Sequence, residues 1–195
     1  MRGIALVGLA LVVLVQAGCD RADKPAAAPV VSAKPAEPTP VMPAVAPPVT
    51  VPIGKFDAIS TTAMGVTGDL TATSDGFVFS QGQTYGLVGA GQAKGADSFA
   101  TTGSTLASVL GVPATAELKV FRVTREYPAK ARNGGFCGAD PTTFILTSEG
   151  VDPGGAPALF LMAFKGANPP SATSAETDLC GTFMYAPSAG PPATK

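Results

Sequence analysis

Apolar residues between positions 55 and 187 come in short runs that alternate with turn residues, a pattern typical of β-strands. Phe77 and Phe79 are separated by Val78, so we expect both rings on one face of a sheet. Asp75-Gly76 predicts a hairpin turn, because a type I′ turn requires positive φ angles that glycine adopts readily. In all, the pattern predicts strands at 64–73, 76–80, 84–88, 116–126, 142–148, 158–164 and 180–186.

The segment 103–113 instead spaces its apolar residues as a short helix does. We expect Ser104 to cap this helix and Gly111 to end it. The strand at 116–126 has apolar residues on both of its faces, which predicts that it is covered on both sides. Together these elements predict a mainly β domain, a small antiparallel sandwich or barrel with one short helix.

The glycine-rich stretch 89–95, "GAGQAKG", follows a predicted strand and looks at first like a nucleotide-binding loop. Its third glycine comes one residue late, and no helical pattern follows that would offer its N-terminus to a phosphate. We therefore expect a flexible connection here.

The chain ahead of this domain has a different composition. Residues 20–54 are mainly Ala, Pro and Val, and proline at this density prevents both helix and sheet. We expect a disordered, extended tether, and roughly 30 residues at about 3.1 Å each would reach about 90 Å. The proposed organisation is a signal segment at 1–18, a tether at 19–54, a β-rich domain at 55–187 and a disordered tail at 188–195.

The first residues form a secretion signal by their layout. Arg2 precedes an apolar run from Ile4 to Val15, which at 12 residues is shorter than the roughly 20 that a membrane-spanning helix needs. The run ends in Ala17-Gly18-Cys19, which resembles the lipobox of bacterial lipoproteins, although Gln16 departs from the usual aliphatic residue.

That resemblance implies cleavage before Cys19 and acylation of its thiol, so that the protein is anchored in a bilayer and faces the periplasm. Several acyl chains, each gaining about 0.8 kcal/mol per buried CH₂, would anchor it stably. In that family an Asp after the lipidated cysteine often marks retention in the inner membrane, and Asp20 holds that position.

Cys137 and Cys180 remain once Cys19 is acylated. An oxidising periplasm favours a disulfide between them, and the absence of a Cys-x-x-Cys spacing indicates a structural role.

The sequence contains no histidine, which excludes Ser-His-Asp and Cys-His nucleophile systems and the common zinc sites. It shows no other metal-ligand or cofactor motif. A carboxylate-dependent hydrolase of glycans or peptides stays open as an alternative, and it would need two acids about 5 to 9.5 Å apart in one cleft.

One group of basic residues stands out, although residues 55–187 carry eight Lys and Arg against eleven Asp and Glu. It is a candidate anion-binding patch for a cell-wall or lipid phosphate. Strict alternation would place Arg122 opposite Lys119 and Arg125, which argues against one concentrated patch. No basic stripe with interleaved aromatics suggests nucleic-acid binding. The group consists of Lys119, Arg122, Arg125, Lys130 and Arg132.

The sequence thus favours a non-enzymatic, membrane-anchored lipoprotein whose β-domain binds an envelope protein or a cell-wall component. In outline it is similar to small lipoproteins such as the membrane-bound lysozyme inhibitors, without any of their motifs. A binding role predicts an exposed apolar patch, with Phe136, Tyr127 or Tyr185 at its rim. The oligomeric state stays open.

Overall fold

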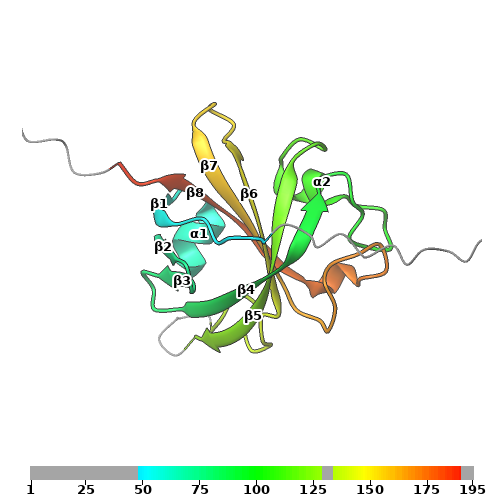
Figure 1. Ribbon diagram of the computed structural model, residues 1–195, viewed down its shortest axis with the longest axis horizontal. Coiled ribbons are helices and arrows are strands. Elements are labelled where there is room, and N and C mark those ends of the chain that lie inside the picture. Colours follow the sequence, from blue (N-terminus) through cyan, green and yellow to red (C-terminus); the bar gives the residue numbers. More distant parts are fainter. Residues whose placement is uncertain (1–47, 129–133, 190–195) are drawn as a thin grey trace, which may run out of the picture. The chain divides into compact units, whose positions relative to one another are not determined.

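Eight antiparallel strands close into a barrel in the computed structural model, which describes residues 48–128 and 134–189. Each strand pairs with the next in sequence, and β8 pairs with β1 to complete the closure (Figure 1). The elements are β1 (Gly54–Ala58), α1 (Thr61–Val66), β2 (Leu70–Thr73), β3 (Gly76–Phe79), β4 (Thr84–Lys94), α2 (Leu106–Leu110), β5 (Glu117–Tyr127), β6 (Phe144–Val151), β7 (Pro157–Phe164), the 3₁₀ helix η1 (Glu176–Asp178) and β8 (Leu179–Pro187).

The predicted mainly β, antiparallel class is confirmed, and the pairing of β8 with β1 makes the fold a barrel. The strand expected at 64–73 is wrong in its first half. Ser60 has an extended backbone and its Oγ accepts a hydrogen bond from Ala63 N, which starts α1. The strand begins only at Leu70. Strand β1 was not predicted.

The glycine-rich stretch 89–95 is not a loop, contrary to the prediction. Most of it is the second half of β4, which is paired with β5 as far as Lys94 opposite Glu117. The β4–β5 pairing contains two irregularities, one beside Ala90 and one beside Thr124. Each adds one unpaired residue and so reverses the alternation of side chains beyond it.

The barrel interior is filled with aromatic side chains. Phe77 and Phe79 both point inward, as their spacing predicted. The interior cluster also contains Tyr85, Phe121, Phe136, Phe183 and Tyr185.

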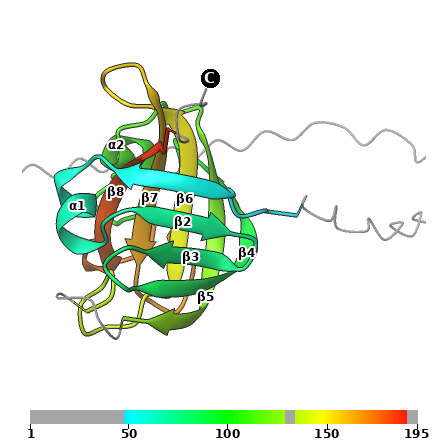
Figure 2. The same cartoon turned by 90° about the vertical axis from the view of Figure 1, so that its left-hand side faces the viewer.

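A second cluster covers the outer face of β5, β6 and β7. The connection between β4 and β5, which contains α2, packs Phe99, Leu106 and Leu110 against this covered face. Strand β5 therefore has Leu118 under this cover and Phe121 inside the barrel, so the prediction that it is covered on both sides is confirmed. In Figures 1 and 2, α2 lies on the opposite side of the barrel from β2 and β3.

The expected helix at 103–113 is confirmed as α2, with a different cap. Thr105, not Ser104, occupies the N-cap position, where its side chain accepts a hydrogen bond from Ser108 N. Gly111 ends the helix with φ of 75°, a conformation that glycine adopts without strain.

Candidate functional site

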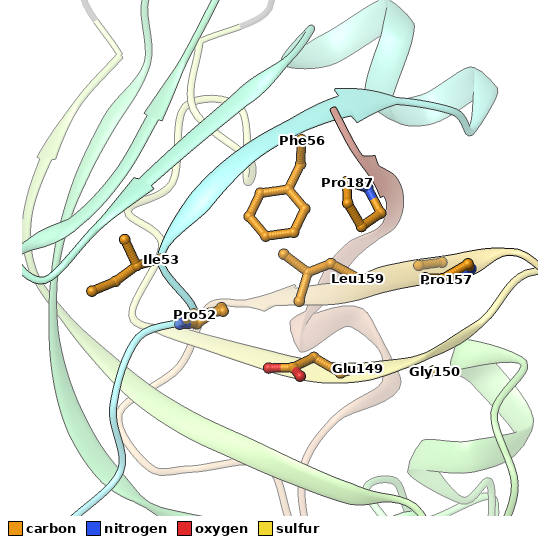
Figure 3. Close-up of a pocket in the computed structure, with 9 residues that line it drawn as sticks. Pro52, Ile53, Phe56, Glu149, Gly150, Pro157, Leu159 and Pro187 are labelled. Atoms are coloured by element: carbon orange, nitrogen blue, oxygen red, sulfur yellow. The ribbon is translucent and has the colours of Figure 1, made fainter. Parts of the chain in front are cut away.

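One end of the barrel, which we call the mouth, holds a pocket of about 370 Å³. The mouth is the end where the β6–β7 hairpin and residues 48–53 lie. The pocket's walls are mainly apolar, and Glu149 supplies its only charged side chain. Figure 3 shows Phe56, Leu159 and Pro187 gathered on one side, with the Glu149 carboxylate reaching into the same space from β6. The other apolar walls are Pro52, Ile53, Pro157 and Ala158.

The β6–β7 hairpin positions Glu149 and Leu159, which are paired across the two strands. The turn at its tip is held by Asp152, whose Oδ1 accepts hydrogen bonds from Gly154 N and Ala156 N, both at 2.8 Å. Such an Asx turn fixes the strand register, so this wall of the pocket is preformed.

Residues 48–53 supply the opposite wall and have no regular secondary structure. Val49 and Val51 pack against the interior cluster, which holds the segment across the mouth. A Cβ atom at Gly89 of β4 would lie 2.7 Å from Val49 O, so only glycine allows this approach. The segment leaves Ile53 75% exposed beside the pocket.

The Glu149 carboxylate is paired with Lys119 of β5, with Nζ and Oε1 3.2 Å apart. Both side chains are partly exposed, so the pair contributes little to stability. Its effect is to place one oriented carboxylate at the rim of an apolar hollow.

Next to the pocket, the mouth becomes polar along β4 and β5. Lys94 lies opposite Glu117, and both line a second hollow of about 320 Å³ together with Gln92 and Asp97. Asp97 Oδ2 accepts a hydrogen bond from Lys94 N at 2.7 Å, which fixes the end of β4.

The opposite end of the barrel is closed by a loop that inserts a side chain. Phe136 stacks on Tyr85 with ring centroids 4.6 Å apart, and its backbone N–H donates to the Tyr85 hydroxyl at 2.9 Å. Burial raises the pKa of Tyr85 well above its ordinary value. The disulfide between Cys137 and Cys180, as predicted, ties this loop to β8 with a Cα–Cα distance of 4.9 Å.

The structure separates the predicted basic residues. Lys119 shares the inner face of β5 with Phe121, whereas Arg122 and Arg125 both lie on the outer face. The earlier expectation that Arg122 and Arg125 lie on opposite faces is wrong, because the irregularity beside Thr124 inserts an unpaired residue between them. Lys130 and Arg132 lie outside the described residues, as does Cys19.

Two of the three expected rim aromatics are interior instead. Phe136 is buried in the loop plug, and Tyr185 is buried beside Thr67, with the two hydroxyls 2.7 Å apart. Tyr127 alone is exposed, at 54%. Sequence spacing could not distinguish the two buried aromatics from the exposed one. Phe136 follows two glycines, and Tyr127 and Tyr185 both lie near the end of a strand.

Several carboxylates have structural partners. Glu126 accepts hydrogen bonds from both Thr142 N and Thr142 Oγ1, which holds the closing loop. Asp69 accepts a hydrogen bond from Ala58 N.

The mouth pocket was not predicted from the sequence. Its clearest sequence signal is the group of prolines at 52, 157 and 187, which border strands and bring apolar surface to one end of the barrel.

Within the described part of the chain, no helix is long and apolar enough to cross a membrane. A scan against protein-family models found no match, and searches of curated proteins and of solved structures found none either.

Proposed function

We propose that the chain is a lipid-anchored periplasmic protein whose barrel binds an envelope protein or a cell-wall component without catalysing a reaction. The mouth pocket is the binding site in this proposal. One observation carries it: a hollow of about 370 Å³ with apolar walls and a single carboxylate. Binding sites commonly combine a preformed apolar hollow with a few oriented polar groups, and the mouth of a β-barrel is one of their usual places.

The lining suggests the chemistry of the bound group. Phe56, Leu159 and the prolines would contact an apolar side chain or ring, and Glu149 would accept a hydrogen bond or an ion pair from a donor beside it. Since aromatic side chains fill the barrel beneath, the ligand would enter the mouth and not the barrel axis.

Binding is favoured over carboxylate-dependent hydrolysis. Glycosidic chemistry would need two acids converging in one cleft, whereas one acid lines the mouth pocket and Lys119 is paired with it. The second hollow has two acids, but Asp97 there accepts a hydrogen bond from Lys94 N and Lys94 lies opposite Glu117.

The first test is site-specific photo-crosslinking in envelopes. Ile53 is exposed and lines the pocket, so a photoreactive phenylalanine analogue there would reach a bound partner without disturbing the core. We expect a discrete cross-linked product from position 53. The matched control places the same analogue at Met64, which is exposed on α1.

Identical products from positions 53 and 64, or none from 53, would contradict the pocket as the site. The product from position 53 should also disappear when Glu149→Lys is combined with Pro157→Glu, both exposed positions at the rim. Thermal unfolding of this variant would show that the barrel is intact.

The anchor is tested separately. The chain expressed in a Gram-negative host should incorporate labelled palmitate and enter the detergent phase on phase separation, while Cys19→Ser should do neither. Equal labelling of the two proteins would disprove the lipid anchor and leave the pocket proposal standing.

A further inference from the structure

The outer wall formed by β3, β4 and β5 presents a set of side chains that the mouth pocket does not use. Strand register places Val78 beside Thr84 and Thr84 beside Tyr127. It also places Val88 beside Arg122 and Gly86 beside Arg125. Phe77, Tyr85, Leu87 and Phe121 point into the barrel, so the residues next to them in sequence, which are Val78, Thr84, Gly86, Val88 and Arg122, face outward. Arg125 and Tyr127 face outward too, because they are paired with Gly86 and Thr84. We call Val78, Thr84, Val88, Arg122, Arg125 and Tyr127 the outer wall.

This wall lacks the cover that α2 gives to the other side of the barrel. Val78 is 45%, Val88 56% and Tyr127 54% exposed, and they are among the most exposed large apolar residues that the structure describes. Figure 2 views the barrel with β2 and β3 in front and α2 behind. The wall is therefore an open sheet face with apolar and aromatic side chains on it.

The two arginines lie close to the barrel surface, and Arg122 reaches from the outer wall toward β6. The Arg122 guanidinium is 4.8 Å from the centre of the Phe144 ring, and Arg125 runs along Gly86, where an added Cβ would lie 3.6 Å from Arg125 Nε. The ion pairs of the described residues are Lys119–Glu149 and Lys165–Asp140, so neither arginine is neutralised there. Asp75 borders the same shallow hollow as Arg125 without an ion pair.

We propose that the outer wall is a membrane-docking face that binds the anionic headgroups of a lipid bilayer. The planar guanidinium matches phosphate oxygens in two-point hydrogen bonds, and tyrosine is favoured at the depth of the headgroups. Val78 and Val88 would contact the boundary of the acyl chains.

The outer wall needs only a modest affinity for an anionic bilayer. Each arginine near an anionic surface contributes about fivefold to partitioning, so Arg122 and Arg125 together contribute about 25-fold. An acyl anchor at Cys19 would keep the wall at a high effective concentration near the bilayer, although the docking face itself does not depend on that anchor.

The test is co-sedimentation of residues 20–195, which lack Cys19 and so carry no acyl chain, with lipid vesicles. We expect binding to vesicles of phosphatidylcholine with about one third phosphatidylglycerol and little binding to phosphatidylcholine alone. Arg122→Gln with Arg125→Gln should lower partitioning about 25-fold. Lys55→Gln with Lys94→Gln removes the same charge from exposed positions elsewhere and should have a much smaller effect.

A fluorescence measurement then locates the contact. The chain contains no tryptophan, so Tyr127→Trp introduces a single reporter, whose emission should shift to the blue on addition of anionic vesicles. Met64→Trp, on α1, should not shift. Equal partitioning of the arginine and lysine variants, equal shifts at both positions, no vesicle binding, or preference for an acidic protein over vesicles would each overturn the docking face.

This outcome is independent of the mouth pocket. Pro157→Glu should bind vesicles like the unmodified chain, whereas it should lower the yield of the product cross-linked from position 53.

Discussion

Two buried tyrosines hold polar chemistry inside an otherwise apolar barrel. Tyr85 accepts a hydrogen bond from Phe136 N, and Tyr185 shares one with Thr67 at 2.7 Å. Burial is the main cause that raises the pKa of each phenol well above its ordinary value near 10. At neutral pH both side chains therefore serve as neutral hydrogen-bonding groups that connect the closing loop and α1 to the strands.

Tyr185→Phe removes a buried hydroxyl and leaves Thr67 with its backbone partner Ala63 O. We expect the free energy of unfolding to fall by about 1 to 2 kcal/mol, measured by urea denaturation. Tyr127→Phe makes the same chemical change at an exposed site and should alter stability by less than about 0.5 kcal/mol. Equal losses in the two variants would contradict the structural role of the Thr67–Tyr185 bond.

Alkaline pH should destabilise the barrel through the same phenols. Because the pKa of each is raised in the folded state, their contribution is fully present below about pH 10 and is lost as the pH rises above it. Each buried tyrosine should lower the free energy of unfolding by about 1.4 kcal/mol per pH unit in that range. Urea denaturation between pH 8 and 11 measures this slope, which Tyr85→Phe should reduce and Tyr127→Phe should not.

At the scale of elements, irregular backbone decides which side chains meet. Thr124 has no partner on β4, which brings Arg122 and Arg125 to one face of β5. Ala90 likewise has no partner on β5, so the alternation of side chains along β4 reverses beyond it. A strictly alternating strand would have placed Arg122 and Arg125 on opposite faces of β5. Gly89, in turn, lets residues 48–53 approach β4 and form one wall of the mouth pocket.

Gly89→Ala should displace residues 48–53, because its Cβ would lie 2.7 Å from Val49 O. We expect a loss of about 1 to 3 kcal/mol in the free energy of unfolding. Gly65→Ala, inside α1 with open space around it, should instead raise stability by about 0.5 to 1 kcal/mol. Chemical denaturation of both variants checks the opposite signs, and a destabilised Gly65→Ala would contradict this account of α1.

The disulfide is the main covalent support of the closed end. Cys137→Ala with Cys180→Ala opens a loop with a sequence separation of 43 residues. The loop-closure model then gives a loss of about 4 kcal/mol in the free energy of unfolding. Urea denaturation with and without reductant measures this loss, and reductant should leave the double variant unchanged. An unmodified chain that is equally stable when reduced would contradict the prediction.

At the scale of the whole barrel, two hydrophobic clusters share one sheet. The interior cluster fills the barrel, and α2 with its flanking residues covers the outside of β5 to β7. The mouth pocket and the outer wall of β3 to β5 are distinct surfaces. The proposed partner and the proposed bilayer would therefore bind different parts of the barrel.

Local patterns in the sequence determined the antiparallel β class, the hairpin between β2 and β3, the helix ending at Gly111 and the pairing of two cysteines. Each depends on neighbouring residues or on composition. The turn of the β2–β3 hairpin is Ser74-Asp75, one residue earlier than the predicted Asp75-Gly76, because Gly76 is already paired with Thr73. Closure of the barrel, the burial of Phe136 and Tyr185 and the assembly of Phe56, Glu149 and Leu159 at one mouth were decided only by the tertiary structure. These features join strands far apart in sequence, and a single unpaired residue in a strand is enough to change which face a side chain occupies.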